Sequence, residues 1–195
     1  MPQTITSRER AKADRRSALL HAAAEQFAAR GFAGVSLEDL GAAVGVSGPA
    51  VYRHFASKQA VLAALLVDVS RELVDGGEAV IAAAADADTA LRGLIGFHVD
   101  FALSNPDVIV VQDRDLDSLA ADDRNAVRSL QRSYIEAWVG VLGAMHRSTP
   151  VAELRIRVRA TFGLINSTPH SARSASRSSV RALLESMALA ALTSA

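Results

Sequence analysis

Hydrophobic positions along the chain recur at the three- and four-residue spacing that is typical of amphipathic helices. Leu19, Ala23 and Phe27 repeat every four residues and predict a helix over about residues 13–30. The same pattern predicts longer helices near residues 58–84, 88–104, 106–118, 121–147, 150–166 and 177–193. The sequence contains no alternating strand pattern and no internal repeat. We therefore predict an all-α fold.

Residues 31–58 predict two short helices joined by a tight turn. Ser36 precedes an apolar run and has Asp39 three residues later, which is a variant of the capping box that starts a helix. This first helix is expected near residues 37–44. Gly45 follows it and suits a left-handed C-terminal stop.

The second short helix is expected to begin after a cap at Ser47, with Pro49 in its first turn, and to end near Phe55. Val51 and Phe55 are four residues apart and share the inward face. The opposite face carries Gly48, Pro49, Tyr52 and Arg53. Two short helices that cross at a tight turn are typical of a helix-turn-helix.

The outward face suits the major groove of DNA. A recognition helix brings its N-terminal residues to base edges, and here these are Ser47, Gly48, Pro49 and Ala50. Pro49 and Ala50 can contact a thymine methyl group, whereas Gly48 reads no base. Arg53 is the candidate for guanine readout, worth roughly 1–3 kcal/mol of discrimination, although it could equally hold a phosphate.

Phosphate contacts position a protein on DNA without reading its sequence. The side chains suited to this role are Tyr52, His54 and Lys58. Ser36 and Ser57 begin helices whose free N–H groups can also hold phosphates.

These residues carry a family resemblance. Over about residues 13–62 the chain resembles the DNA-binding domain of the tetracycline-repressor (TetR) family, on the motifs Gly31-Phe32, Ser36, Val46-Ser47, Val51-Tyr52-Arg53-His54-Phe55 and Ser57-Lys58. The resemblance implies a helical homodimer that binds a palindromic operator, usually represses transcription, and is released by a small ligand in its C-terminal domain. The DNA contacts it implies are Ser36, Ser47, Pro49, Ala50, Tyr52, His54 and Lys58. Gly48 stands where other members often have a larger polar side chain.

We accordingly divide the chain into a three-helix helix-turn-helix DNA-binding domain at 1–60 and a helical ligand-binding and dimerisation domain at 61–195. The net charge of zero hides a split, because residues 1–60 carry eight basic against five acidic residues. Five of these basic residues form a possible phosphate-tracking arm: Arg8, Arg10, Lys12, Arg15 and Arg16.

Composition and targeting signals narrow the location. The absence of cysteine excludes disulfides and thiolate metal sites. The N-terminus lacks the apolar stretch of a signal peptide, and no run of 18 apolar residues predicts a membrane span. We expect a cytoplasmic protein without a membrane partner or a cofactor.

The C-terminal domain offers a candidate ligand cavity, lined by Phe97, His98, Phe101, Tyr134, Trp138 and Phe162. The alternative is that these residues are ordinary core. The expected effector is small and apolar or amphipathic, with a fatty-acyl compound or acyl thioester as one candidate. Arg155, Arg157 and Arg159 would favour an anion, or they form a solvated face.

The last two predicted helices are candidates for a dimer interface that forms a four-helix bundle. Their apolar positions are Leu154, Val158, Ala160, Phe162 and Ile165 on one helix, and Val180, Leu183, Leu184, Met187, Ala188 and Leu192 on the other. Packing within one chain would produce the same pattern. Between these helices, residues 167–179 are expected to form a mobile loop.

Two other classes of protein compete with a DNA-binding regulator. An enzyme is disfavoured, because Pro49 replaces the last glycine of a nucleophile elbow and no glycine-rich phosphate loop is present. Paired metal-ligand spacing is also missing among the five histidines, which are His21, His54, His98, His146 and His170. A helical partner-binding module without specific DNA binding is the other alternative, and Gly48 is its best argument.

Overall fold

The computed structural model describes residues 7–171 and 175–194, which form helices and turns without a strand. The predicted all-α fold class is therefore confirmed. The helices are α1 (Ser7–Arg30), α2 (Leu37–Ala43), α3 (Gly48–Val51), α4 (Lys58–Ala83), α5 (Ala87–Ser104), α6 (Pro106–Asp115), α7 (Ala121–Met145), α8 (Val151–Ile165), α9 (Thr168–Ser171) and α10 (Arg177–Thr193), with a 3₁₀ turn at Leu116–Ser118.

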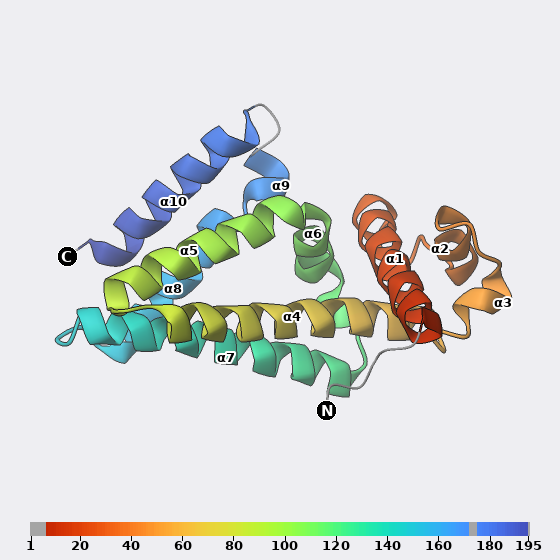
Figure 1. Ribbon diagram of the computed structural model, residues 1–195, viewed down its shortest axis with the longest axis horizontal. Helices are drawn as coiled ribbons and strands as arrows, with labels where there is room; N and C mark the ends of the chain where they lie inside the picture. The colour runs from red at the N-terminus through yellow and green to blue at the C-terminus, as the bar shows by residue number, and fades with distance from the viewer. Residues whose placement is uncertain (1–6, 172–174, 195) are drawn as a thin grey trace.

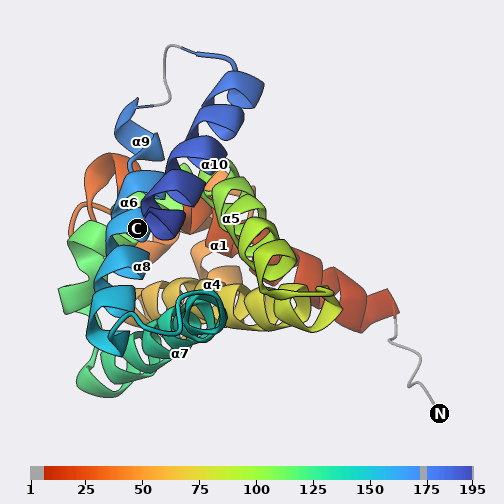
Figure 2. The same cartoon turned by 90° about the vertical axis from the view of Figure 1, so that its left-hand side faces the viewer.

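Helix α4 connects the two ends of the molecule. Figure 1 shows α1, α2 and α3 gathered at one end of α4, while α5, α7, α8 and α10 surround its other end. Helices α5 and α7 pack directly on α4, and α10 packs across α5 and α8. Figure 2 looks along the molecule from the end that carries the second group.

Helices α2 and α4 start at the predicted caps, Ser36 and Ser57. The Ser36 hydroxyl accepts a hydrogen bond from the Asp39 N–H at 3.1 Å, and the Asp39 carboxylate accepts one from the Ser36 N–H at 2.8 Å. These hydrogen bonds hold the pKa of Asp39 below its usual value. Ser57 caps α4 through the Ala60 N–H. Gly45 has a φ value of 69°, which confirms the left-handed stop predicted there, and Gly31 ends α1 in the same way with a φ value of 78°.

Four local predictions need correction. Helix α1 begins at Ser7 rather than near residue 13, so the basic segment forms the first turns of a helix rather than an arm. Helix α3 ends at Val51, because the His54 N–H bonds to the Val51 carbonyl and tightens the last turn. The Ser47 hydroxyl caps no described N–H group of α3. Part of the predicted loop at 167–179 is helix α9, and residues 172–174 lie outside the described residues.

The buried side chains form two clusters: α4 contributes buried residues to the first and packs partly buried residues against the second. The first joins α1, α2 and α3 to the first half of α4, and it includes Val108 and Val111 from α6. The second fills the space between α4, α5, α7, α8 and α10 around Trp138. Within the described ranges no single helix is long and apolar enough to cross a membrane; α5 and α6 meet that test only as a pair bent by 85°.

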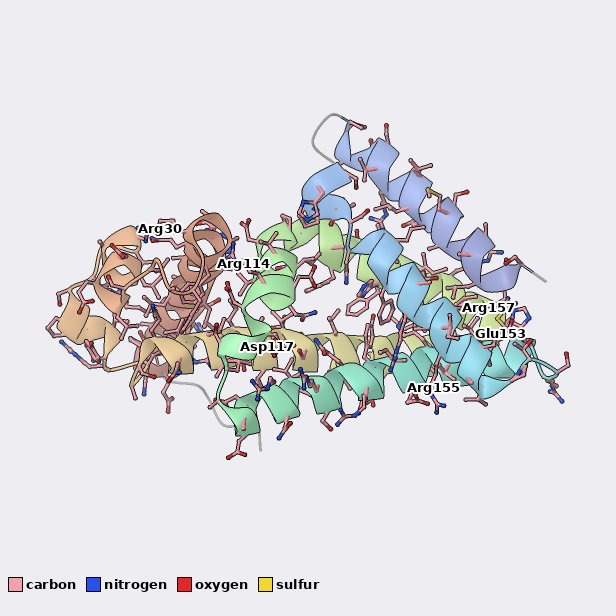
Figure 3. All side chains as sticks on the ribbon, turned by 180° about the vertical axis from the view of Figure 1, so that it is seen from behind. Arg30, Arg114, Asp117, Glu153, Arg155 and Arg157 are labelled. Carbon is pink, nitrogen blue, oxygen red and sulfur yellow. The ribbon has the colours of Figure 1, made fainter. Side chains whose placement is uncertain are left out.

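Arg114 of α6 ties the two regions together. Its guanidinium donates to the Ala28 carbonyl at 3.1 Å and to the Phe27 carbonyl, and it forms an ion pair with Asp115. Figure 3 shows Arg114 at the junction of α6 and α1. The C-terminal end of α1 is thereby attached to a helix that also borders the second cluster.

Candidate DNA interface and ligand cavity

The helix-turn-helix is held by a close approach of α2 to α3. A Cβ atom at Gly41 would lie 2.8 Å from the Val46 carbonyl and 2.9 Å from the Val51 side chain, so only glycine fits there. Val51 and Phe55 are buried, as their spacing predicted. With this inner face anchored, the rest of α3 and its C-terminal turn face outward.

The outward face carries the predicted base-reading residues. Ser47, Pro49, Tyr52 and Arg53 are exposed, while Gly48 and Ala50 are half-buried. Tyr52 is 54 % exposed, a high fraction for an aromatic ring. The guanidinium of Arg53 pairs with no carboxylate of a described residue, so it remains available to bind an anion or a base edge.

Lys58 has contacts within the protein. Its ammonium donates to the Phe32 carbonyl at 2.7 Å and lies 4.5 Å from the centre of the Phe32 ring. These contacts attach the start of α4 to the turn after α1. These contacts hold Lys58 in place, and its predicted contact with a phosphate would use the ammonium donors that remain.

A basic hollow of about 370 Å³ lies beside the recognition helix, lined by Ala11, Lys12, Arg15, Arg53 and His54. Burial lowers the pKa of His54, and the charges of Lys12, Arg15 and Arg53 lower it further. A neutral imidazole keeps one N–H that can donate to a phosphate, and the charged groups of this hollow are Lys12, Arg15 and Arg53.

The remaining basic residues of α1 have other positions. Arg16 pairs with Asp68 at 2.8 Å and covers the Phe55 ring, so it supports the fold. Arg10 is exposed, and the side chain of Arg8 lies outside the described part of the chain. Lys12 and Arg15 are therefore the members of the predicted arm that lie beside α3.

A second hollow, of about 220 Å³, lies between α4, α5, α6, α7 and the end of α8. Its lining comprises Ser70, Leu73, His98, Phe101, Val108, Ile109, Gln112, Gln131, Tyr134, Ile135, Phe162 and Asn166. Four of the six predicted ligand residues are in this set: His98, Phe101, Tyr134 and Phe162. The amides of Gln112, Gln131 and Asn166 were not predicted, although glutamines on otherwise apolar helix faces were a usable signal.

The other two predicted ligand residues lie elsewhere. Phe97 packs against the backbone of α4 at Gly76. Trp138 is fully buried and meets the Phe162 ring edge-on, with 5.1 Å between ring centres. Trp138 therefore packs against three residues of the cavity wall, His98, Tyr134 and Phe162, without lining the cavity itself.

The polar groups of the cavity are uncharged. Burial lowers the pKa of His98 to about 4, against a weaker opposing effect of the Asn166 side chain. Burial also raises the pKa of Tyr134, whose hydroxyl lies 3.4 Å from the Nδ1 atom of His98. The Phe162 ring stacks on His98 with 4.5 Å between centres.

The three arginines of α8 are outside this cavity. Arg155 forms a two-pronged ion pair with Glu136 on α7, and Arg157 pairs with Glu153. Arg159 is exposed. Figure 3 shows Arg155 on the side of α8 that faces α7 and Arg157 on the side that faces the end of α10. Their position favours the second of the two predicted alternatives, a solvated face.

A helix-turn-helix with an exposed basic face, joined by one long helix to a helical domain with a cavity, defines a DNA-binding transcriptional regulator. Residues 19–65 match the family model described as "Bacterial regulatory proteins, tetR family", and residues 84–192 match "Tetracyclin repressor-like, C-terminal domain". The second match alone covers more than half of the chain. The protein belongs to the TetR family.

Two curated relatives and one solved structure illustrate the similarity. The chain is 27% identical over 134 residues to the repressor KstR2 of Rhodococcus jostii, covering 68% of this chain and 66% of KstR2. It is 33% identical over 88 residues to the activator FasR of Mycolicibacterium smegmatis, covering 45% of this chain and 40% of FasR. A TetR-family regulator from Bordetella parapertussis has the same fold, with a TM-score of 0.78, 23% identity, and coverage of 89% and 93%.

Proposed function

We propose that this protein represses transcription by binding a palindromic operator as a homodimer, and that a small molecule in the 220 Å³ cavity releases it. The observation that carries the proposal is the exposed face of α3 and its turn, where Tyr52 and Arg53 face outward beside Lys12 and Arg15. Arg53 reads a base, while Tyr52 and the two α1 cations hold phosphates. The resemblance to the repressor KstR2 supports the sign of regulation.

The dimer uses the outer faces of α8 and α10. Most of the predicted apolar positions are buried within the single chain, among them Leu154, Val158, Leu184 and Leu192. Large apolar side chains that remain exposed on the same two helices are Val151, Ile156, Leu183 and Met187. A contact between two copies through these helices would cover them in a four-helix bundle. We further propose that the protein acts in the cytoplasm without a catalytic activity or a cofactor.

The proposal is tested with the purified protein and a palindrome from upstream of its own gene. We expect nanomolar binding that weakens steeply with salt and exceeds binding to scrambled DNA by at least about 1,000-fold. Arg53→Ala should relax the preference at one base-pair position in each half-site, at a cost of roughly 1–3 kcal/mol. The matched control is Arg92→Ala, because Arg92 pairs with Asp88 on α5, away from the interface.

Equal affinity for palindromic and scrambled DNA would overturn the proposal. It would favour a helical partner-binding module without specific DNA binding. A reporter gene placed behind the operator then tests the sign of regulation. If the protein is a repressor, its deletion should raise reporter expression. If it is an activator, as FasR is, its deletion should lower reporter expression.

A further inference from the structure

The polar groups deep in the cavity wall are not available to a ligand. The Nδ1 atom of His98 lies 3.4 Å from the Tyr134 hydroxyl, and the Asn166 side chain is a hydrogen-bonding neighbour of the same ring. The Nε2 atom of His98 and the Oδ1 atom of Asn166 are themselves buried, so an occupant of the hollow does not reach them. Ser70 is also buried, and its hydroxyl donates to the Leu66 carbonyl. The wall presents ring faces and aliphatic side chains here.

Two amides of the cavity lining are in a different situation. Gln112 of α6 and Gln131 of α7 line the hollow, and both are half-buried. Neither amide forms a hydrogen bond with a described residue, and none of their polar atoms is shielded from the surface. An occupant of the hollow can therefore reach the nitrogen and the oxygen of both amides.

The spacing along both helices directs these amides to the hollow. Gln112 follows Ile109 by three residues, and Gln131 precedes Tyr134 by three residues. Residues three apart share one face of a helix, and both of these neighbours also line the hollow. Each glutamine thus extends a lining face by one turn. The hollow combines aromatic and aliphatic walls with two reachable amides.

The lining also limits the charge of the effector. No aspartate, glutamate, lysine or arginine is among the described lining residues. The titratable members, His98 and Tyr134, are uncharged at neutral pH, because burial lowers the pKa of His98 to about 4 and raises that of Tyr134. A carboxylate in this position would lose its hydration without gaining a cation. The ligand that fits is neutral.

A glutamine amide is best matched by a group that both donates and accepts, because its nitrogen carries two donors and its oxygen accepts. A carboxamide or a lactam presents an N–H beside a carbonyl oxygen, so it can pair with such an amide through two hydrogen bonds. An ester, thioester or ketone oxygen only accepts, and it leaves the glutamine oxygen unpaired. A carboxylate also only accepts, and it adds a charge that nothing in the lining compensates.

We propose that the effector is a neutral ring compound with a carboxamide-type group, which the amides of Gln112 and Gln131 bind. This inference rests on the proposed function, in which the cavity is the effector site. The rings of Phe101, Tyr134 and Phe162 pack against the apolar part of the ligand. An engineered apolar cavity of about 150 Å³ holds benzene. The space of about 220 Å³ therefore accepts one ring with short substituents.

Calorimetric titration of the full-length protein tests the inference with four matched probes: 4-propylbenzamide, 4-propylacetophenone, propylbenzene and 4-propylbenzoate. The first two differ only in an NH₂ group that is replaced by a methyl group. We expect 4-propylbenzamide to bind about 10- to 100-fold more tightly than the ketone and than propylbenzene, because only the amide donates hydrogen bonds. Equal affinity for the amide and the ketone, tighter binding of the benzoate, or no binding of any probe would overturn the inference.

Variants then test the two amides. Gln112→Leu and Gln131→Leu each remove one amide, so each should reduce the preference for 4-propylbenzamide over 4-propylacetophenone by about 3- to 10-fold. The matched control is Gln59→Leu, because Gln59 is exposed on α4 outside the cavity lining. It should leave the preference unchanged. An undiminished preference in both cavity variants would contradict the assignment.

A change of charge at the same position provides a second test if the leucine variants do not fold. Gln112→Glu places a carboxylate in the lining, so it should strengthen binding of the cation 4-propylbenzylammonium by at least about 10-fold relative to the wild type. The same variant should weaken binding of 4-propylbenzamide. Unchanged affinity for both probes would show that residue 112 does not contact the ligand, and would overturn the inference.

Failure of this inference is distinguishable from failure of the proposed function. Binding to the palindrome is measured on the same preparation without any probe. Specific DNA binding without a preference for the amide would overturn the ligand class alone. Preference for the amide without specific DNA binding would support the ligand class and overturn the regulator.

Discussion

His98 owes its neutral state to burial rather than to a charged neighbour. Its ring lies between Phe162, Tyr134 and Trp138 in the middle of the aromatic cluster. Desolvation disfavours a charged imidazole, and the Asn166 side chain compensates only in part. A histidine with a pKa of about 4 remains uncharged through the physiological range, so in this site it acts as a hydrogen-bonding group.

The lowered pKa of His98 makes stability depend on pH. In the unfolded chain the imidazole has a pKa near 6.5, so as pH falls the unfolded state takes up the proton first. Stability should therefore be lost as pH falls from about 7 towards 4, by about 2 kcal/mol from this group between pH 7.5 and 5. Urea unfolding of the wild type and His98→Phe at both pH values measures this.

The variant should lose correspondingly less stability between the two pH values. His21→Gln is the control, because its ring is exposed beside Glu25. An identical pH dependence in His98→Phe and the wild type would mean that His98 is not protonated differently in the folded and unfolded states.

At the residue scale, the sequence predicted which side chains are exposed better than it predicted which groups they contact. The four-residue spacing of Val51 and Phe55 correctly indicated the inner face of the recognition helix, and so left Tyr52 and Arg53 outside. The position of Lys58 was not predictable in the same way, because its partner is the Phe32 carbonyl, a backbone atom 26 residues away. Such a contact depends on the angle of the turn after α1, which residue spacing does not reveal.

At the element scale, the capping signals at Ser36 and Ser57 correctly predicted where α2 and α4 begin. The start of α1 was missed because residues 7–12 carry no apolar stripe, and residues 7 and 9–12 are exposed. Arginine, glutamate, lysine and alanine favour helix by propensity without any core contact. Periodicity detects a buried face, so it could not detect this extension.

Helix α4 approaches its neighbours through glycines. A Cβ atom at Gly77 would lie 2.6 Å from the ring of the buried Tyr134, whereas one at Gly140 on α7 would meet nothing within 4 Å. In both places alanine gains about 1 kcal/mol of helix propensity. At Gly77, displacement of the ring costs about 1–3 kcal/mol and outweighs this gain.

We therefore expect opposite signs from one substitution. Gly77→Ala should lower the free energy of unfolding by about 1 kcal/mol, and Gly140→Ala should raise it by about the same amount. Urea denaturation of the two variants beside the wild type is the measurement. A stabilised Gly77→Ala would show that α4 and α7 can separate at little cost. The close approach of the two helices would then contribute nothing to the free energy of unfolding.

At the scale of the whole molecule, the two hydrophobic clusters leave apolar side chains of α10 exposed on the surface. The predicted interface residues proved to be of two kinds: Leu184 and Leu192 complete the internal core, while Leu183 and Met187 are exposed. The sequence could not separate them, because packing within a chain and between two chains uses the same helical spacing. Only the angle at which α10 crosses α5 and α8 decides which side of the helix is covered.

Leu183→Glu combined with Met187→Glu should convert the dimer into a monomer. Leu183 is 60 % exposed and Met187 44 %, so the isolated fold tolerates the charges, whereas a contact between two α10 helices would bury them without a counterion. Sedimentation equilibrium should show the monomer mass, and affinity for the palindrome should fall by at least about 100-fold, since a monomer engages a single half-site. Ser133→Glu, at an exposed position on α7, is the control. A double variant that stays dimeric and keeps its operator affinity would place the interface on another face.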